Sequence, residues 1–246
     1  MTAPPDRLSR VRTVADTVLY EGYLLYPYRA SSDKNRARWQ FGVLGPPGAL
    51  DRGLGEADSM TLQTVLARVT DTAGILVHLR FLQLQHRQVL DAADRACEQL
   101  SVHGTDGDRT EVTWDEAVEQ ELTVRFSLDG GSLDPADVTV PGGEETEALT
   151  DAEGVRVGSV VRGRRDLAAR ITATLEPHGS LTRLTLLVEN AHPDRPATRE
   201  DATSTSLLGA HLLVEADGAA FVSLVDPPDG AAELAAQCRQ DRCWPF

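Results

Sequence analysis

Residues 77–81, Val-His-Leu-Arg-Phe, and residues 122–128, Leu-Thr-Val-Arg-Phe-Ser-Leu, alternate between apolar and polar side chains. Successive side chains of a β-strand point to opposite faces, so this period of two predicts strands with one buried face and one solvated face. The alternation returns in residues 181–190, LTRLTLLVEN, and in a weaker form in residues 170–176, RITATLE. These stretches predict a mainly β fold, built from antiparallel sandwich-like sheets with a few short helices.

Two further apolar runs lack a clean alternation. Residues 206–215, SLLGAHLLVE, and residues 219–226, AAFVSLVD, have apolar side chains at consecutive positions. A strand that is covered on both faces has this composition, so the pattern favours central strands for both runs.

A short amphipathic helix is predicted near the N-terminus. Val11, Val14 and Val18 recur at intervals of three to four positions within residues 10–23, which places them along one side of a helix. Pro27 argues against a longer helix, because its ring removes a backbone N–H and disfavours helical geometry in the residue before it.

Three other segments carry helical signals. Thr113 and Glu116 have the spacing of a capping box, which predicts a short helix through residues 118–121. Residues 91–100 and residues 230–239 are rich in alanine and are also predicted to be helical.

The segments between these elements have the composition of loops. Residues 45–58 are rich in Gly and Pro, residues 128–135 contain Asp-Gly-Gly, and residues 141–154 form an acidic stretch. We find no internal repeat. We expect a single β-rich domain over residues 1–246, with a possible subdivision near residues 130–150.

Composition and charge exclude several classes of protein. The net charge of −14 argues against a general nucleic-acid binder, which needs a surplus of Lys and Arg on at least one face. Three cysteines in 246 residues fit a reducing compartment better than a disulfide framework. We see no signal peptide and no apolar run of the roughly 18 residues that a membrane span needs, so a cytoplasmic protein is expected.

The polar residues match no familiar catalytic or ligand-binding motif. The six histidines lack metal-ligand spacing, and no glycine-rich phosphate loop occurs, so we expect neither a metal nor a cofactor. The six are His78, His86, His103, His178, His192 and His211. A metal-dependent hydrolase assembled from separated strands, with residues such as Glu21, His78 and His211, remains the less favoured alternative.

Two further groups of residues invite a chemical interpretation. Ser204 and Ser206 precede His211, but no G-x-S-x-G elbow accompanies them, which argues against a serine hydrolase. Cys238 and Cys243 are five positions apart, a spacing that fits neither a redox C-x-x-C motif nor a common zinc pair. We interpret them as a core cysteine and an exposed one, with a redox role as the alternative.

The chain concentrates aromatic and basic residues in residues 20–40, YEGYLLYPYRASSDKNRARWQ. Tyr, Trp and Arg are enriched where proteins bind partners, because the rings contribute apolar area and Arg gives directional hydrogen bonds. The alternatives are a hairpin that buries the rings in the core, or a platform on which a small ligand stacks. The candidate partner-binding residues are Tyr26, Tyr28, Lys34, Asn35, Arg36 and Trp39.

Several stretches together resemble an uncharacterised bacterial protein family that is encoded near [NiFe] hydrogenase genes. The resemblance is carried by residues 18–46, by TWDEAVEQE at 113–121, by AHLL at 210–213, by FVSLVDPP at 221–228 and by the Cys-x4-Cys-Trp-Pro ending at 238–245. It covers nearly the whole chain, from Val11 to Pro245.

The resemblance implies a non-catalytic accessory, assembly or partner-binding role, with hydrogenase subunits or maturation factors as partners. A β-sandwich module that binds a small ligand remains the alternative. Members of the family continue beyond the Trp-Pro at residues 244–245, so the resemblance also implies that this chain is C-terminally truncated. In that case the apolar end, residues 243–246, is expected to be exposed.

Overall fold

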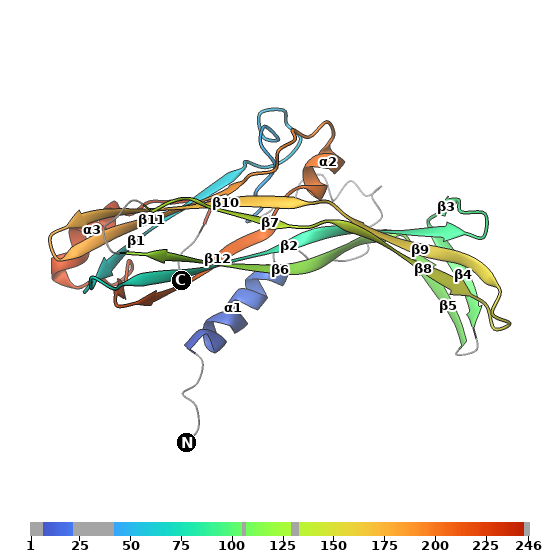
Figure 1. Ribbon diagram of the computed structural model, residues 1–246, viewed down its shortest axis with the longest axis horizontal. Helices are drawn as coiled ribbons and strands as arrows, with labels where there is room; N and C mark the ends of the chain where they lie inside the picture. The colour runs from blue at the N-terminus through green and yellow to red at the C-terminus, as the bar shows by residue number, and fades with distance from the viewer. Residues whose placement is uncertain (1–6, 22–41, 105–106, 129–132, 244–246) are drawn as a thin grey trace, which may run out of the picture.

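The computed structural model describes residues 7–21, 42–104, 107–128 and 133–243 (Figure 1). The helices are α1 (Arg7–Glu21), α2 (Arg199–Ser204) and α3 (Ala232–Gln237), and a 3-10 turn, η2 (Asp229–Ala231), precedes α3. The strands are β1 (Ser59–Ala67), β2 (Gly74–Asp91), β3 (Ala96–Cys97), β4 (Gln99–Gly104), β5 (Gly107–Val112), β6 (Trp114–Ser127), β7 (Ala136–Val140), β8 (Gly143–Thr150), β9 (Arg156–Arg164), β10 (Leu167–His178), β11 (Leu181–Asn190), β12 (Leu208–Asp217), β13 (Ala220–Val222) and β14 (Gln240–Asp241).

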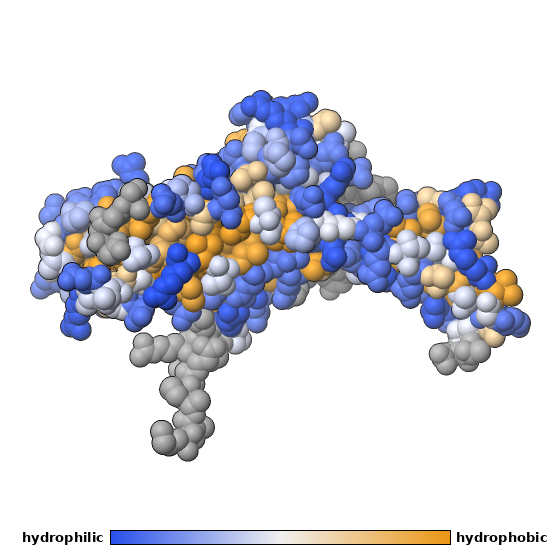
Figure 2. Space-filling model, viewed as in Figure 1, coloured by the Kyte–Doolittle hydropathy of each residue, from blue (hydrophilic) through white to orange (hydrophobic). Residues whose placement is uncertain are grey.

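Two antiparallel sheets form the two layers of the molecule, which confirms the predicted mainly β fold. One sheet has the order β13-β1-β11-β10-β7, and β14 also pairs with β1. The other has the order β12-β2-β9-β8, and β6 and β3 also pair with β2. Figure 2 shows a band of hydrophobic side chains between the layers, bordered by hydrophilic ones.

The main core lies between the two sheets. Phe81 and Leu79 of β2 pack there with Leu184 and Leu186 of β11 and with Ile171 of β10, and all five are buried. The alternation at residues 77–81, 122–128, 170–176 and 181–190 therefore marks real strands, β2, β6, β10 and β11, with their apolar side chains facing inward.

The prediction that residues 206–215 and 219–226 form central strands is wrong. Among the described residues β12 pairs only with β2, and β13 pairs only with β1, so both lie at sheet edges. β12 is nevertheless covered both by the main core and by α1. Ala210 joins the main core, and Leu208 packs against Leu19 of α1. Its continuous apolar composition reflects this second cover and not a central position.

The helix predicted at residues 10–23 is confirmed as α1, but two of the valines that define its apolar side in the sequence are not the residues that pack against the sheet. Val11 and Val14 are about half exposed, whereas Ala15 and Leu19 are buried. The helix near residues 230–239 is confirmed in a shorter form, because the chain leaves α3 at Cys238 in extended geometry.

Residues 91–100 and 113–121 are not helical. The Asp91 carboxylate accepts hydrogen bonds from the backbone N–H groups of Ala93 and Arg95, which makes a tight turn, and the chain continues into β3 and β4. Thr113 caps no helix: its hydroxyl donates to the Cys97 carbonyl and accepts from the Val89 N–H. Pairing with β2 thus overrides the local helical signals at both places.

The acidic stretch at residues 141–154 is a strand for most of its length. β8 pairs with β9 from Gly143 to Thr150, and its side chains are exposed apart from Leu149. Charged side chains on an edge strand oppose pairing with other molecules, which explains why a stretch with loop-like composition forms a stable edge.

A second, smaller core lies where the far half of β2 extends beyond the main one. Val89, Val102, Leu149 and Val160 pack there, from β2, β4, β8 and β9. We call residues 85–119 and 143–164 the arm; Figure 1 shows the arm projecting at the right, where β4 and β5 form a hairpin beside β8 and β9. Because β2 supplies residues to both cores, one continuous strand links the arm to the two-sheet body.

Gln83 fixes the point at which β2 passes from the body into the arm. Its side chain is fully buried and donates to the carbonyl oxygens of Pro141 (3.3 Å) and Arg165 (2.8 Å). Its own oxygen accepts a hydrogen bond from Gln120 at 2.9 Å. One amide therefore joins β2, β6 and the chain segments that lead into β8 and out of β9.

Replacing Gln83 with leucine is expected to lower the free energy of unfolding by about 1–3 kcal/mol, because the carbonyl groups of Pro141 and Arg165 and the Gln120 amide lose their hydrogen bonds to this buried side chain. Urea denaturation measures the change. The matched control is Gln99→Leu at an exposed position of β4, for which we expect a change within about 0.5 kcal/mol. Equal effects of the two substitutions would contradict the role of Gln83.

Candidate functional site

The outer face of the β12-β2-β6 sheet carries a row of charged residues. Because Leu79 and Phe81 point into the core, the intervening Arg80 points to the opposite face of the sheet. In the register of the sheet, Arg80 lies between Glu121 of β6 and His211 of β12. His78 lies in the next row on the same face, beside Thr123 of β6.

α1 covers this face from outside the two layers (Figure 1). Leu19 of the helix is buried against Leu82, Leu84 and Leu208. Two ion pairs hold the preceding turns: Arg12 contacts Glu121 and Asp16 contacts Arg80. The helix is thus attached by an apolar contact at one end and by charges toward the other.

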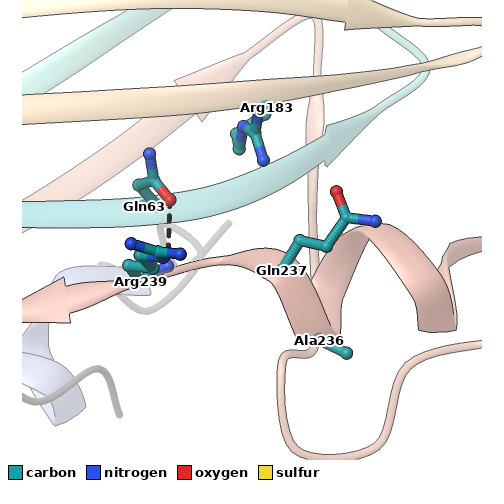
Figure 3. Close-up of a pocket in the computed structure, with 5 residues that line it drawn as sticks. All are labelled: Gln63, Arg183, Ala236, Gln237 and Arg239. Carbon is teal, nitrogen blue, oxygen red and sulfur yellow. Dashed lines mark hydrogen bonds between the residues drawn. The ribbon is translucent and has the colours of Figure 1, made fainter.

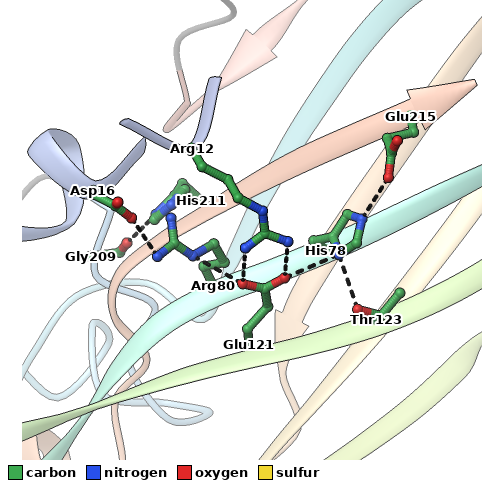
Figure 4. A network of polar contacts seen from close by, with 9 residues as sticks. All are labelled: Arg12, Asp16, His78, Arg80, Glu121, Thr123, Gly209, His211 and Glu215. Carbon is green, nitrogen blue, oxygen red and sulfur yellow. Dashed lines mark hydrogen bonds and ion pairs between the residues drawn. The ribbon is translucent and has the colours of Figure 1, made fainter. Parts of the chain in front are cut away.

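Figure 4 shows the hydrogen bonds and ion pairs among these charged residues. Arg12 donates two hydrogen bonds to the carboxylate of Glu121, at 2.6 and 2.7 Å, in the bidentate geometry that favours Arg–carboxylate pairs. Arg80 donates to Asp16 at 2.7 Å, and its Nε lies 3.4 Å from Glu121. Glu121 is therefore shared between an arginine of the helix and a buried arginine of the sheet.

The same carboxylate also reaches His78. The His78 Nδ1 lies 3.2 Å from Glu121 and 3.0 Å from the Thr123 hydroxyl, while Nε2 lies 3.1 Å from Glu215. His78 is buried, so these contacts satisfy both of its ring nitrogens.

The hydrogen bonds from Arg12 lower the pKa of Glu121 below its ordinary value, and the charges of Arg12, Arg80 and His78 act in the same direction, while partial burial opposes them. Glu121 therefore stabilises the folded protein above its ordinary pKa of about 4.5, and this contribution is lost as the pH falls through the lowered value.

Glu121→Gln is expected to lower the free energy of unfolding by about 1–3 kcal/mol, since the buried Arg80 loses a compensating charge and Arg12 loses its ionic partner. The partial exposure of Glu121 keeps the effect below that of a fully buried pair. Thermal or urea unfolding at pH 7 measures it. Glu144→Gln, on the exposed face of β8, is the control and should change stability by less than about 0.5 kcal/mol. Equal losses in both variants would contradict the network.

The structure brings together two of the three residues named for a metal-dependent hydrolase. His78 and His211 lie on the same face of adjacent strands, whereas the side chain of Glu21 lies outside the described part of the chain. Within the residues that the structure describes, no group of three or more His, Cys, Asp or Glu side chains is placed to hold a metal ion.

The hydroxyl groups near His211 serve the turns after α2. Ser204 donates to the Asp201 carbonyl, and Ser206 donates to the Ala202 carbonyl. The His211 ring bonds instead to the carbonyl of Gly209 at 2.9 Å. Both serine hydroxyls thus bond to carbonyl groups of α2.

All three cysteines are free thiols, and all are half-buried. Cys238 packs in a cluster with Val65 and Leu234, while Cys243 packs against the main core and donates to the Thr61 carbonyl at 3.0 Å. Burial raises the pKa of both thiols, which disfavours the reactive thiolate. The interpretation of one core and one exposed cysteine is therefore wrong, since both are half-buried.

A polar groove of about 630 Å³ lies beside α3 and β14 (Figure 3). Gln63 lines it and accepts a hydrogen bond from the backbone N–H of Arg239 at 2.9 Å. Arg183 also lines it and is paired with Glu176. Since Gln63 bonds to Arg239 across the groove and Arg183 is engaged by Glu176, we interpret the groove as the seam that attaches the C-terminal segment to β1.

The six candidate partner-binding residues, Tyr26, Tyr28, Lys34, Asn35, Arg36 and Trp39, lie outside the described residues. The two alternatives for this stretch, core hairpin and ligand platform, lie there too. No motif in the sequence points to Arg12, Asp16, Arg80 or Glu121 as a functional group. The signal that was available is the alternation itself, which places Arg80 and His78 on the outer face of a strand.

No protein-family model matches the chain, and a search of the curated proteins finds no similar sequence. In the described part of the chain, none of the helices has the length and apolar character needed to cross a membrane.

Proposed function

We propose that this chain is a non-catalytic accessory protein that binds a partner through its arm, and that the partner belongs to a [NiFe] hydrogenase system. The observation that carries the proposal is the charge of the arm. Residues 85–119 and 143–164 contain 14 of the 38 acidic residues but only 6 of the 24 basic ones. This part of the chain, less than a quarter of its length, therefore carries more than half of the net charge of −14.

The geometry of the arm suits contact with another protein. It has its own small core, it projects from the body, and the acidic side chains of β8 are exposed along its edge. A projecting surface of one charge sign steers an oppositely charged partner and fixes its orientation on binding. The contact surface of the partner is therefore expected to be basic.

The hydrogenase system as the source of the partner rests on the family resemblance. A cytoplasmic location is part of the same proposal, and the three free thiols support it, because unpaired cysteines are typical of reducing compartments. The stretch at residues 20–40 remains a second candidate contact.

Affinity purification of the tagged chain from its host, grown with hydrogen as the electron donor, tests the proposal. We expect hydrogenase subunits or maturation factors to be recovered and identified by mass spectrometry. Replacing Glu144 and Glu145 together with lysine should reduce that recovery about tenfold, because two attractive charges become repulsive. Raising the salt concentration should weaken binding in the same way.

The matched control replaces Glu200 and Glu233 with lysine, which changes the net charge equally at exposed positions away from the arm. Recovery should then stay close to that of the unchanged protein. Equal losses in both double variants would show that net charge alone matters and would contradict the arm as the contact. Failure to recover any hydrogenase component would contradict the proposed partner.

A further inference from the structure

A β-bulge places His211 directly opposite Arg80. The register between β12 and β2 shifts between Leu208 and His211, and Gly209 within the shift has a φ of +62°, in the left-handed region that favours glycine. The Ala210 N–H donates to the Gly42 carbonyl, which anchors the bulge. His211 and Arg80 thus become cross-strand neighbours, at a separation where two like charges destabilise a sheet.

Hydrogen bonding determines which nitrogen of His211 carries the proton in the neutral ring. The Gly209 carbonyl can only accept, so Nδ1 donates to it and Nε2 keeps its lone pair. Two buried side-chain nitrogens in the described residues lack a hydrogen-bond partner, His211 Nε2 and Arg80 Nη1. Figure 4 shows the Arg80 guanidinium beside the His211 ring.

These two groups are complementary while the histidine is neutral. The unpartnered Nη1–H of Arg80 is a donor and the unpartnered Nε2 of His211 is an acceptor, and the hydrogen bond from Arg80 to Asp16 uses a different nitrogen, Nη2. Protonation removes the lone pair and sets two donors and two positive charges against each other. Asp16 is then shared between two cations.

We propose that Arg80 and His211 form a proton-controlled clasp for α1. With His211 neutral, Arg80 holds Asp16 and the helix stays on the sheet. With His211 protonated, the like-charge pair weakens the Arg80–Asp16 contact, and α1 detaches more often.

The charges that face His211 come from each packed element. Arg80 of β2 opposes protonation, while Asp16 of α1 and Glu121 of β6 favour it, and the hydrogen bond to Gly209 favours it as well. Arg12, His78 and Glu215 belong to the same network of polar contacts and connect to it through Glu121 and His78 (Figure 4). Burial outweighs the favourable terms and lowers the pKa of His211 below its ordinary value of 6.5.

The direction of the pH effect follows from this lowered pKa. Detachment of α1 removes part of the burial that lowers the pKa of His211, while Arg80 stays opposite the ring. The pKa is therefore higher in the detached state than in the docked state, and the detached state takes up the proton first as the pH falls. Docking of α1 therefore weakens as the pH falls from the higher pKa of the detached state to the lowered pKa of the docked state. One proton changes the equilibrium by at most about tenfold per pH unit.

Nitrogen NMR of the histidine rings tests the first step in the unchanged full chain. The expected result is the Nδ1–H tautomer for His211 at pH 7.5 and a titration midpoint below 6.5. The Nε2–H tautomer, or a midpoint above 6.5, would overturn the proposal. Because the experiment uses the unchanged protein, a misfolded variant cannot obscure the result.

Amide hydrogen exchange in α1, corrected for the intrinsic effect of pH, tests the second step between pH 7.5 and 5.5. We expect the opening equilibrium of residues 7–21 to rise several-fold in the unchanged protein and to stay nearly constant in His211→Gln. His103→Gln, at an exposed site on β4, should keep the full pH effect. If the effect persists in His211→Gln, it belongs to another group such as His78, and the clasp is wrong.

Discussion

The structure depends on one strand, β2, both of whose faces are buried. The inner face presents Leu79 and Phe81 to the core between the sheets. The outer face presents Arg80, a charge that is 6% exposed and that requires compensation at this depth. Glu121 and Asp16 supply that compensation, so the position of α1 follows from the need to neutralise an arginine in the middle of a sheet.

The length of β2 explains the two-part shape. After Gln83 the strand leaves the body and pairs with β9, and the apolar residues that follow build the small core of the arm. The body thus carries the buried ion network and the arm carries much of the acidic surface. A single strand makes them one continuous structure.

Much of the fold follows from local patterns, because alternation at residues 77–81 and 181–190 reports one buried face directly. The helical signals at Thr113 and at residues 91–100 fail because strand pairing with β2 contributes more than local capping or alanine propensity. The candidate site around Arg80 could not be predicted from such local patterns. His78 and His211 were named as catalytic candidates, but the register that sets His211 beside Arg80 depends on a bulge, and the pairing of Asp16 depends on how a helix docks on a distant strand.

A double-mutant cycle between Asp16 and Arg80 tests whether the buried charge of Arg80 holds α1 on the sheet, using Asp16→Asn and Arg80→Met with unfolding free energies measured at pH 7.5. Asparagine removes the charge and methionine keeps much of the apolar stem, so the cycle isolates the ion pair. A favourable coupling of about 1–3 kcal/mol is predicted, because Arg80 is buried and bonded to the helix. A coupling indistinguishable from zero would show that the docking of α1 does not depend on the charge of Arg80.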